Sequence, residues 1–168
     1  MLPTLLAAAG DPDIKEKLLA GTEVDGTKYK VHLDGYNMLP YLKGQEADGP
    51  RKEFLYWTDD GDLSALRYGN WKVMFLEQRA HGFDVWQDPF VKLRFPKLEN
   101  LRMDPFERAE KEGMDYTRWR AERMFAMMPA QAYVAKWIES FKEFPPRQKA
   151  ASFSVDQVMD KLTSPKIP

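Results

Sequence analysis

The 168-residue chain contains no cysteine and only two histidines, His32 and His81. The lack of cysteine excludes disulfide bonds, thiolate metal sites and cysteine nucleophiles. The two histidines lie far apart in the sequence and have no companion at the spacing of metal ligands, so they give little support to a metal centre. Any chemistry by this chain therefore has to use other side chains.

The sequence also lacks an excess of one charge, a long apolar run and a phosphate-binding loop. Its 25 basic and 26 acidic residues give a net charge of -1, which does not favour nucleic acid or anionic membrane as a partner. No apolar run approaches the roughly 20 residues of a membrane span, and the opening MLPTLLAAAG lacks the basic start and the length of a secretory signal. No serine lies in a G-x-S-x-G elbow.

The residues that are present indicate a folded α+β domain. Hydrophobic residues make up 43% of the chain and aromatic residues 13%, which is enough for one core at this length. Residues 54–77 read as three antiparallel strands, with turns at Asp59–Asp62 and at Gly69–Asn70. Both faces of the first strand are apolar, so we expect it to lie inside the fold. A separate hairpin is expected over 22–33, with its turn at Asp25–Gly26.

The remainder of the chain predicts a long loop followed by helices. Residues 78–96 read as an aromatic-rich loop, and the pattern resumes as a short strand at 98–101. Asp115 is expected to cap a helix that Pro129 divides from a second one. The helix after Pro129 has one apolar stripe and is expected to cover the sheet. A further short helix is expected from Ser154. The stripe of the helix after Pro129 has five members. Its members are Tyr133, Val134, Trp137, Ile138 and Phe141.

Together these patterns predict an α+β fold. A small antiparallel sheet of about four strands is covered by a C-terminal amphipathic helix, and short helices lie at the periphery.

Two charged clusters invite a functional interpretation. Asp59, Asp60 and Asp62 could converge on a hard cation, but the spacing does not fit an EF-hand, and an acidic turn with glycine is ordinary hairpin chemistry. Three arginines between 118 and 123 flank Trp119, as on a nucleic-acid face. The acidic Glu122 and the near-zero net charge favour a solvated helix surface instead.

Five blocks carry a resemblance to a known family. They are PTLLAAAGDPDI, YKVHLDGYNMLPYLKG, RKEFLYWTDDGDLSALRYGNWKVMFLEQRA, LENLRMDPFERAE and KEFPPRQKAASFSVDQV. In this order they resemble the C-terminal part of bacterial arylsulfatases across nearly the whole chain. Glu99 is a departure, because the family often has an aromatic residue at this place.

The resemblance implies a domain that is catalytically inactive by itself. It implies a catalytic-domain tail over 1–21, a sulfatase C-terminal α+β domain over 22–144 and an extension with a short helix over 145–168. The parent enzymes hydrolyse sulfate esters with formylglycine and Ca²⁺, but the formylglycine motif is missing here, so no catalytic or metal-binding residue carries over and no cofactor is expected. We therefore expect no activity from this chain alone.

The resemblance also implies a partner, a sulfatase catalytic domain, whose cleft the chain completes; otherwise, self-association through an apolar patch is expected. Neither nucleic acid nor membrane is expected as a partner. The candidate rim residues of the cleft are Asp59, Asp60, Asp62, His81 and Trp86. Parent enzymes can be periplasmic, but the compartment of this chain stays open.

Two other interpretations stay open beside this one. The chain could be an independent module that binds a small ligand or a protein through the aromatic loop 81–95. It could instead be an enzyme of another type that uses the carboxylates of Asp59–Asp62.

Overall fold

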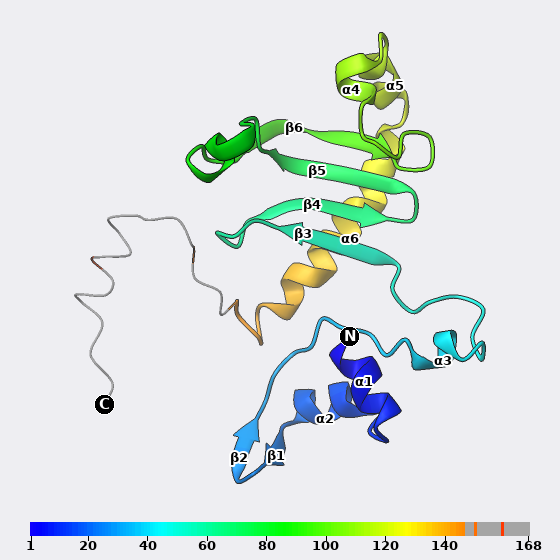
Figure 1. The fold of residues 1–168 in the computed structure, drawn as a ribbon, viewed down its shortest axis with the longest axis vertical. Coiled ribbons are helices and arrows are strands. Elements are labelled where there is room, and N and C mark those ends of the chain that lie inside the picture. Colours follow the sequence, from blue (N-terminus) through cyan, green and yellow to red (C-terminus); the bar gives the residue numbers. More distant parts are fainter. Residues whose placement is uncertain (147–149, 151–158, 160–168) are drawn as a thin grey trace. The chain divides into compact units, whose positions relative to one another are not determined.

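The computed structural model describes residues 1–146, 150 and 159 (Figure 1). The chain divides into two compact units. One unit comprises Met1–Phe54 with Ala135–Pro145, and the other comprises Leu55–Val134 with Pro146–Pro168. The predicted α+β class is confirmed, with a two-stranded and a four-stranded antiparallel sheet and several short helices. The helix expected from Ser154 lies outside the described residues.

The first unit contains short helices and a hairpin. Its elements are α1 (Leu2–Ala8), α2 (Ile14–Ala20), β1 (Thr22–Val24), β2 (Thr27–Tyr29) and α3 (Leu39–Leu42). The hairpin turns at Asp25 and Gly26, whose φ angles of 51° and 75° are those of the expected two-residue turn. The buried Thr4 hydroxyl of α1 donates to the Tyr36 carbonyl at 3.1 Å and accepts from the Met38 amide at 3.0 Å. This side chain therefore ties α1 to the segment before α3.

The second unit is built on the four-stranded sheet, with spatial order β3-β4-β5-β6. Its strands are β3 (Glu53–Trp57), β4 (Leu63–Tyr68), β5 (Trp71–Glu77) and β6 (Val91–Asn100). The first three are the strands that the alternating pattern predicted. The turn between β4 and β5 uses Gly69 at a positive φ of 52°, which glycine adopts without a steric penalty.

The expectation that β3 lies inside the fold is wrong, because none of its five residues is fully buried. It is the first strand in the order and therefore an edge strand, and Phe54 and Trp57 are 45% and 36% exposed. The apolar residues on both faces of β3 misled the prediction because aromatic side chains often lie partly buried at the margin of a sheet.

The predicted loop over 78–96 is also corrected. It contains a short 3₁₀ helix, η1 (Gly82–Trp86), and the beginning of β6, which runs for ten residues. β6 pairs with β5 at Met74↔Lys97 and again at Leu76↔Lys92, so the segment 93–96 forms a bulge opposite Phe75. Pro96 lies in this bulge on an edge strand, the position where a sheet tolerates proline.

Helices follow the sheet. They are α4 (Ala109–Glu112), α5 (Tyr116–Glu122), the 3₁₀ helix η2 (Met124–Ala126) and α6 (Met127–Ser140). The expectation that Pro129 separates two helices is wrong, because α6 begins two residues before it. Proline is accepted in the first turn of a helix, where no intrahelical bond to its nitrogen is needed. Asp115 does occupy the N-cap position of α5, as predicted, without a side-chain capping bond.

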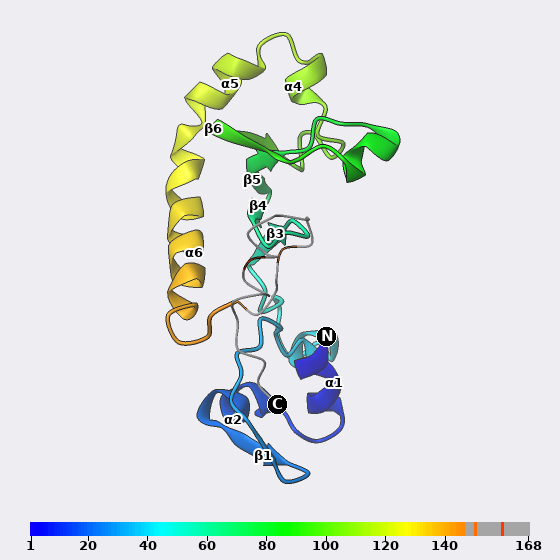
Figure 2. The same cartoon turned by 90° about the vertical axis from the view of Figure 1, so that its left-hand side faces the viewer.

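The core of the second unit lies between the sheet and the beginning of α6 (Figure 2). Leu66, Val73 and Leu98 are fully buried, and Ala126 and Ala130 pack against them. The Tyr68 hydroxyl donates to the Ala126 carbonyl and fixes the entry of α6. Partly buried side chains around this core include Leu55, Trp71, Phe75, Trp119, Met127, Tyr133 and Val134.

Only part of the predicted apolar stripe of α6 joins this core. Tyr133 and Val134 pack against it, whereas Ile138 is 51% exposed. Ala126 and Ala130, which lie outside the predicted stripe, are 2% exposed and belong to the core cluster. Within the described part of the chain, no helix has the length and apolar character of a membrane span.

Candidate functional site

The five predicted rim residues lie on two turns at one end of the sheet (Figure 1). Asp59, Asp60 and Asp62 belong to the turn between β3 and β4, which is closed by a bond from the Thr58 amide to the Asp62 carbonyl at 2.9 Å. Thr58 is buried, while Asp59 and Asp62 are exposed. The turn therefore has the backbone bonding of an ordinary hairpin connection.

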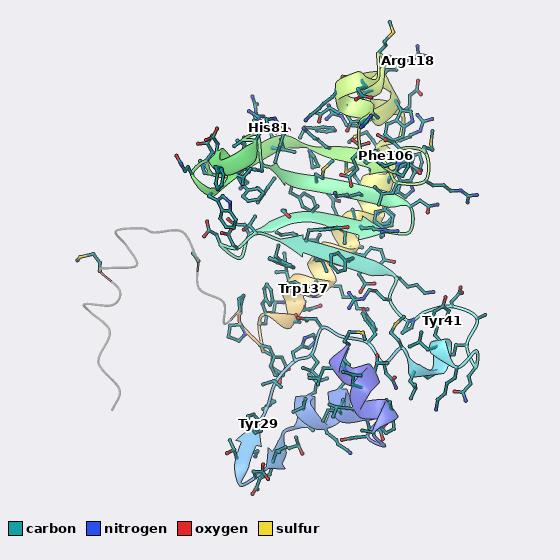
Figure 3. The ribbon with its side chains drawn as sticks, viewed as in Figure 1. Tyr29, Tyr41, His81, Phe106, Arg118 and Trp137 are labelled. Atoms are coloured by element: carbon teal, nitrogen blue, oxygen red, sulfur yellow. The ribbon has the colours of Figure 1, made fainter. Side chains whose placement is uncertain are left out.

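His81, labelled in Figure 3, precedes η1, and Trp86 is the last residue of η1, in the connection between β5 and β6. His81 is exposed, and Trp86 is 80% exposed, together with the neighbouring Phe83 at 86%. The Gln78 amide nitrogen donates to the Asp88 carbonyl at 2.8 Å and to the Val85 carbonyl at 3.4 Å, which braces the turn. The structure thus places all five residues at the same end of the sheet, and whether they face a substrate cleft stays a prediction.

The carboxylates of the described residues do not form a calcium cage. In residues 1–146, 150 and 159, no three acidic or histidine side chains are arranged to hold a metal ion. Ca²⁺ takes six to eight oxygen ligands, several of them carboxylates converging from one site. The described residues therefore offer no such ligand cluster for calcium, the ion that the resemblance to sulfatases implies.

A different set of polar side chains gathers at β6. Tyr116, the first residue of α5, is 8% exposed, and its hydroxyl lies between two backbone groups of Leu98. It accepts from the Leu98 amide at 3.1 Å and donates to the Leu98 carbonyl at 3.0 Å. Burial raises the pKa of this phenol, so it stays protonated and can make both bonds. Tyr116 thereby holds α5 against the strand.

Charged residues flank Leu98 on the strand. Since successive side chains of a strand point to opposite faces, Lys97 and Glu99 lie on the face opposite the core leucine. Lys97 is 8% exposed and pairs with Glu77 at 2.6 Å and with Glu110. The hydrogen bond from Lys97 is the largest cause of the lowered pKa of Glu77. Lys97 therefore links β5, β6 and α4.

Glu99 is the exceptional member of this set. It is 1% exposed, and its Oε2 has no hydrogen-bond partner among the described residues. Its partner across the sheet is Lys72, but the Lys72 ammonium binds both carboxylate oxygens of Glu107, at 2.8 and 2.7 Å. Burial raises the pKa of Glu99 to about 7, and the negative charges of Asp104 and Glu107 add to this effect.

A cavity of about 450 Å³ opens beside Glu99. It lies between the end of β6, the chain after it, α4 and α5, at the end of the sheet opposite the predicted rim residues. Its walls combine carboxylates with an aromatic and thioether surface. The residues that line it are Glu99, Asn100, Met103, Asp104, Ala109, Gly113, Asp115, Tyr116, Arg118, Trp119, Glu122 and Arg123.

The sequence analysis did not select Glu99, Asp104 or Tyr116. The sequence did mark Glu99 in one way, because it is a charged residue at a place where arylsulfatases often have an aromatic one. The arginines beside Trp119 were interpreted as a solvated surface, and Arg118 is indeed exposed and paired with Glu122 at 3.0 Å. Arg123, however, lies over the Trp119 ring with its guanidinium carbon 4.8 Å from the centroid, and both residues line the cavity.

Comparison with known proteins adds no family assignment. No protein-family model matches the sequence, and no curated protein gives a significant match. The similarity to arylsulfatases therefore rests on the five sequence blocks alone.

Proposed function

We propose that this chain is the C-terminal portion of an arylsulfatase-like sulfuric ester hydrolase. It has no catalytic activity alone; it packs on the catalytic domain and shapes the substrate cleft. The α+β fold agrees with the small sheet domain that the resemblance implies. The observation that carries the proposal is the exposed apolar surface of the first unit.

This surface comprises large apolar side chains on α1, the β1–β2 hairpin and α3. On α1, Leu2 and Leu5 are three residues apart, hence on neighbouring positions of one helix face, and are 51% and 59% exposed. Exposed apolar side chains of this size are candidates for cover by another protein, and the first unit carries them on several elements. The remaining members are Met1, Val24, Tyr29, Tyr41 and Leu42, of which Figure 3 labels the two tyrosines.

The proposal is tested with an arylsulfatase catalytic domain that lacks its own C-terminal part. We expect this chain to bind that domain and to raise the melting temperature of the domain. The double variant Leu2→Ser/Leu5→Ser should bind at least about tenfold more weakly, because each leucine that is buried on binding contributes roughly 1.5–3 kcal/mol. Met114→Ser, on the second unit, removes another fully exposed apolar side chain and should leave the affinity unchanged. Analytical ultracentrifugation and thermal melts give both readouts.

Sulfatase activity of the chain alone would contradict the proposal. With 4-nitrophenyl sulfate and Ca²⁺, we expect no hydrolysis above buffer. Turnover that co-purifies with the chain and is lost in Asp59→Asn/Asp62→Asn would contradict the proposal and support an enzyme based on the acidic turn.

A second candidate function is supported by the aromatic turn at η1. Phe83 and Trp86 extend from one braced 3₁₀ turn and are the most exposed aromatic side chains of the described second unit. A rigid pair of exposed rings can hold an aryl or sugar ligand by stacking without a large loss of side-chain entropy. The alternative is an independent binding module that uses the loop 81–95.

Titrating the chain alone with a ligand distinguishes a binding module from a domain that only packs on a catalytic partner. If it is correct, an aryl glycoside raises the melting temperature and quenches Trp86 fluorescence, and Trp86→Ser abolishes both effects. The variant should keep wild-type stability, because Trp86 is 80% exposed. A melting temperature that stays constant over the full titration contradicts the module.

A further inference from the structure

Glu99 places a buried carboxyl near the end of β6. A buried polar atom normally has a hydrogen-bond partner, and an unsatisfied one costs about 1–3 kcal/mol. Glu99 Oε2 has none among the described residues, although the side chain is 1% exposed and lines a cavity of about 450 Å³. This oxygen has less than 1 Å² of accessible surface, so a donor in the cavity reaches it when the side chain turns toward the cavity.

The protein's own cations near Glu99 are already engaged. Lys72 lies opposite Glu99 in the strand register, but its ammonium binds Glu107. Lys97, the next lysine on β6, is held between Glu77 and Glu110. Neither ammonium forms an ion pair with Glu99, although the positive charge of Lys72 acts on it from a distance.

The charges on the cavity wall favour a positive ligand. Four lining residues are acidic and two are basic, which leaves a net charge of -2 when all are ionised. Both basic residues, Arg118 and Arg123, contact the same carboxylate, that of Glu122, at 3.0 and 3.4 Å. The other acidic members, Asp104 and Asp115, lie with Glu99 on the wall.

The rest of the wall fits an apolar body. Tyr116 and Trp119 are stacked, with ring centroids 6.0 Å apart, and Met103 lines the same cavity. The wall thus combines several charged groups with an aromatic and thioether surface, and small-molecule pockets measure about 300–1,000 Å³. The cavity therefore suits a molecule of modest size with one polar end.

We propose that this cavity binds a small organic cation, a primary amine with an aryl or alkyl body, whose ammonium donates to Glu99 Oε2 and whose body packs against Trp119 and Met103. The ammonium supplies donors and a positive charge to a buried carboxylate, and a charge-assisted bond of this kind is about twice as strong as a neutral one. This site is separate from the proposed cleft rim, which lies at the other end of the sheet.

Calorimetric titration with three matched compounds tests the proposal. The compounds are 2-phenylethylammonium, 2-phenylethanol and 3-phenylpropionate, which share the ring and differ in the charge of the polar end. We expect the ammonium compound to bind, the alcohol to bind at least tenfold more weakly and the carboxylate to show no binding. Equal affinity for the amine and the alcohol overturns the proposal.

Variants assign the recognition to Glu99. Glu99→Gln keeps the shape of the side chain and should weaken amine binding at least tenfold, and Asp104→Asn provides a second lining variant with an expected smaller loss. Glu112→Gln makes the same chemical change on α4 at an exposed residue outside the cavity, so its affinity should stay within twofold of the wild type. Circular dichroism confirms that each variant is folded; unchanged binding by folded Glu99→Gln overturns the proposal.

The pH dependence of binding adds a readout that a purely structural role would not change. Asp104, Glu107, Glu110 and Lys72 are the charged groups that act on Glu99, whose pKa is about 7. The carboxyl is ionised above this value, so amine binding should strengthen from pH 6 to pH 8 in the wild type and stay constant in Glu99→Gln. A wild-type affinity that is flat over this range contradicts the assignment.

Discussion

Replacing Leu66 with alanine is expected to lower the free energy of unfolding by about 2–5 kcal/mol, because the side chain is fully buried and its removal leaves a cavity in the core. Leu66 lies on β4, an interior strand of the sheet, and belongs to the same core cluster as Val73 and Leu98. Neighbours on both sides limit how far the structure can collapse into the space. Urea unfolding followed by circular dichroism measures the loss.

Leu42→Ala is the matched control for this substitution. It removes the same atoms from a leucine that is 66% exposed, so we expect a change within about 0.5 kcal/mol. Equal effects of the two substitutions would contradict the position of the core between the sheet and α6.

Stability is expected to fall as the pH rises from 4.5 to about 7, because of Glu99. Its pKa is raised from 4.5 to about 7 in the folded protein, so the folded state holds this proton more tightly than the unfolded chain does. The contribution is fully present below pH 4.5 and is lost as the pH rises through the folded pKa. At about 1.4 kcal/mol per pKa unit, the upper limit is roughly 3.5 kcal/mol.

The measurement is the difference between wild type and Glu99→Gln in urea unfolding at several pH values. The glutamine cannot titrate, so we expect the variant to gain stability relative to the wild type as the pH rises from 5 to 8. Comparing the two proteins removes the contributions of other groups, such as Glu77, whose pKa shifts in the opposite direction. A constant difference across this range would contradict the burial of an ionisable Glu99.

The local pattern of the sequence predicted much of the sheet. The alternation in 54–77 and the turn residues Asp25–Gly26 and Gly69–Asn70 act through neighbours in the chain, and the structure confirms these strands and turns. The length of β6 escaped prediction because a bulge around Pro96 interrupts the period of two. The edge position of β3 escaped because strand order depends on partners that local pattern does not specify.

The candidate cavity was less accessible to sequence reasoning. A glutamate between Leu98 and Asn100 looks like the solvent-facing member of a strand, and its burial depends on chain segments that follow it by several residues or more. Asp104 and Trp119 come near Glu99 only because α4 and α5 fold back beside the end of β6. The structure places the five rim residues at one end of the sheet, and their role in a cleft stays a prediction.

The bond pattern of Tyr116 has a consequence for association between molecules. β6 is the last strand of the sheet, and an outer strand normally offers unpaired amide and carbonyl groups to which a foreign strand can add. At Leu98 both groups are already bonded to one phenol, so a strand from another molecule finds neither donor nor acceptor there. Tyr116 therefore opposes the addition of a foreign strand, and with it fibril-like growth, at this position of β6.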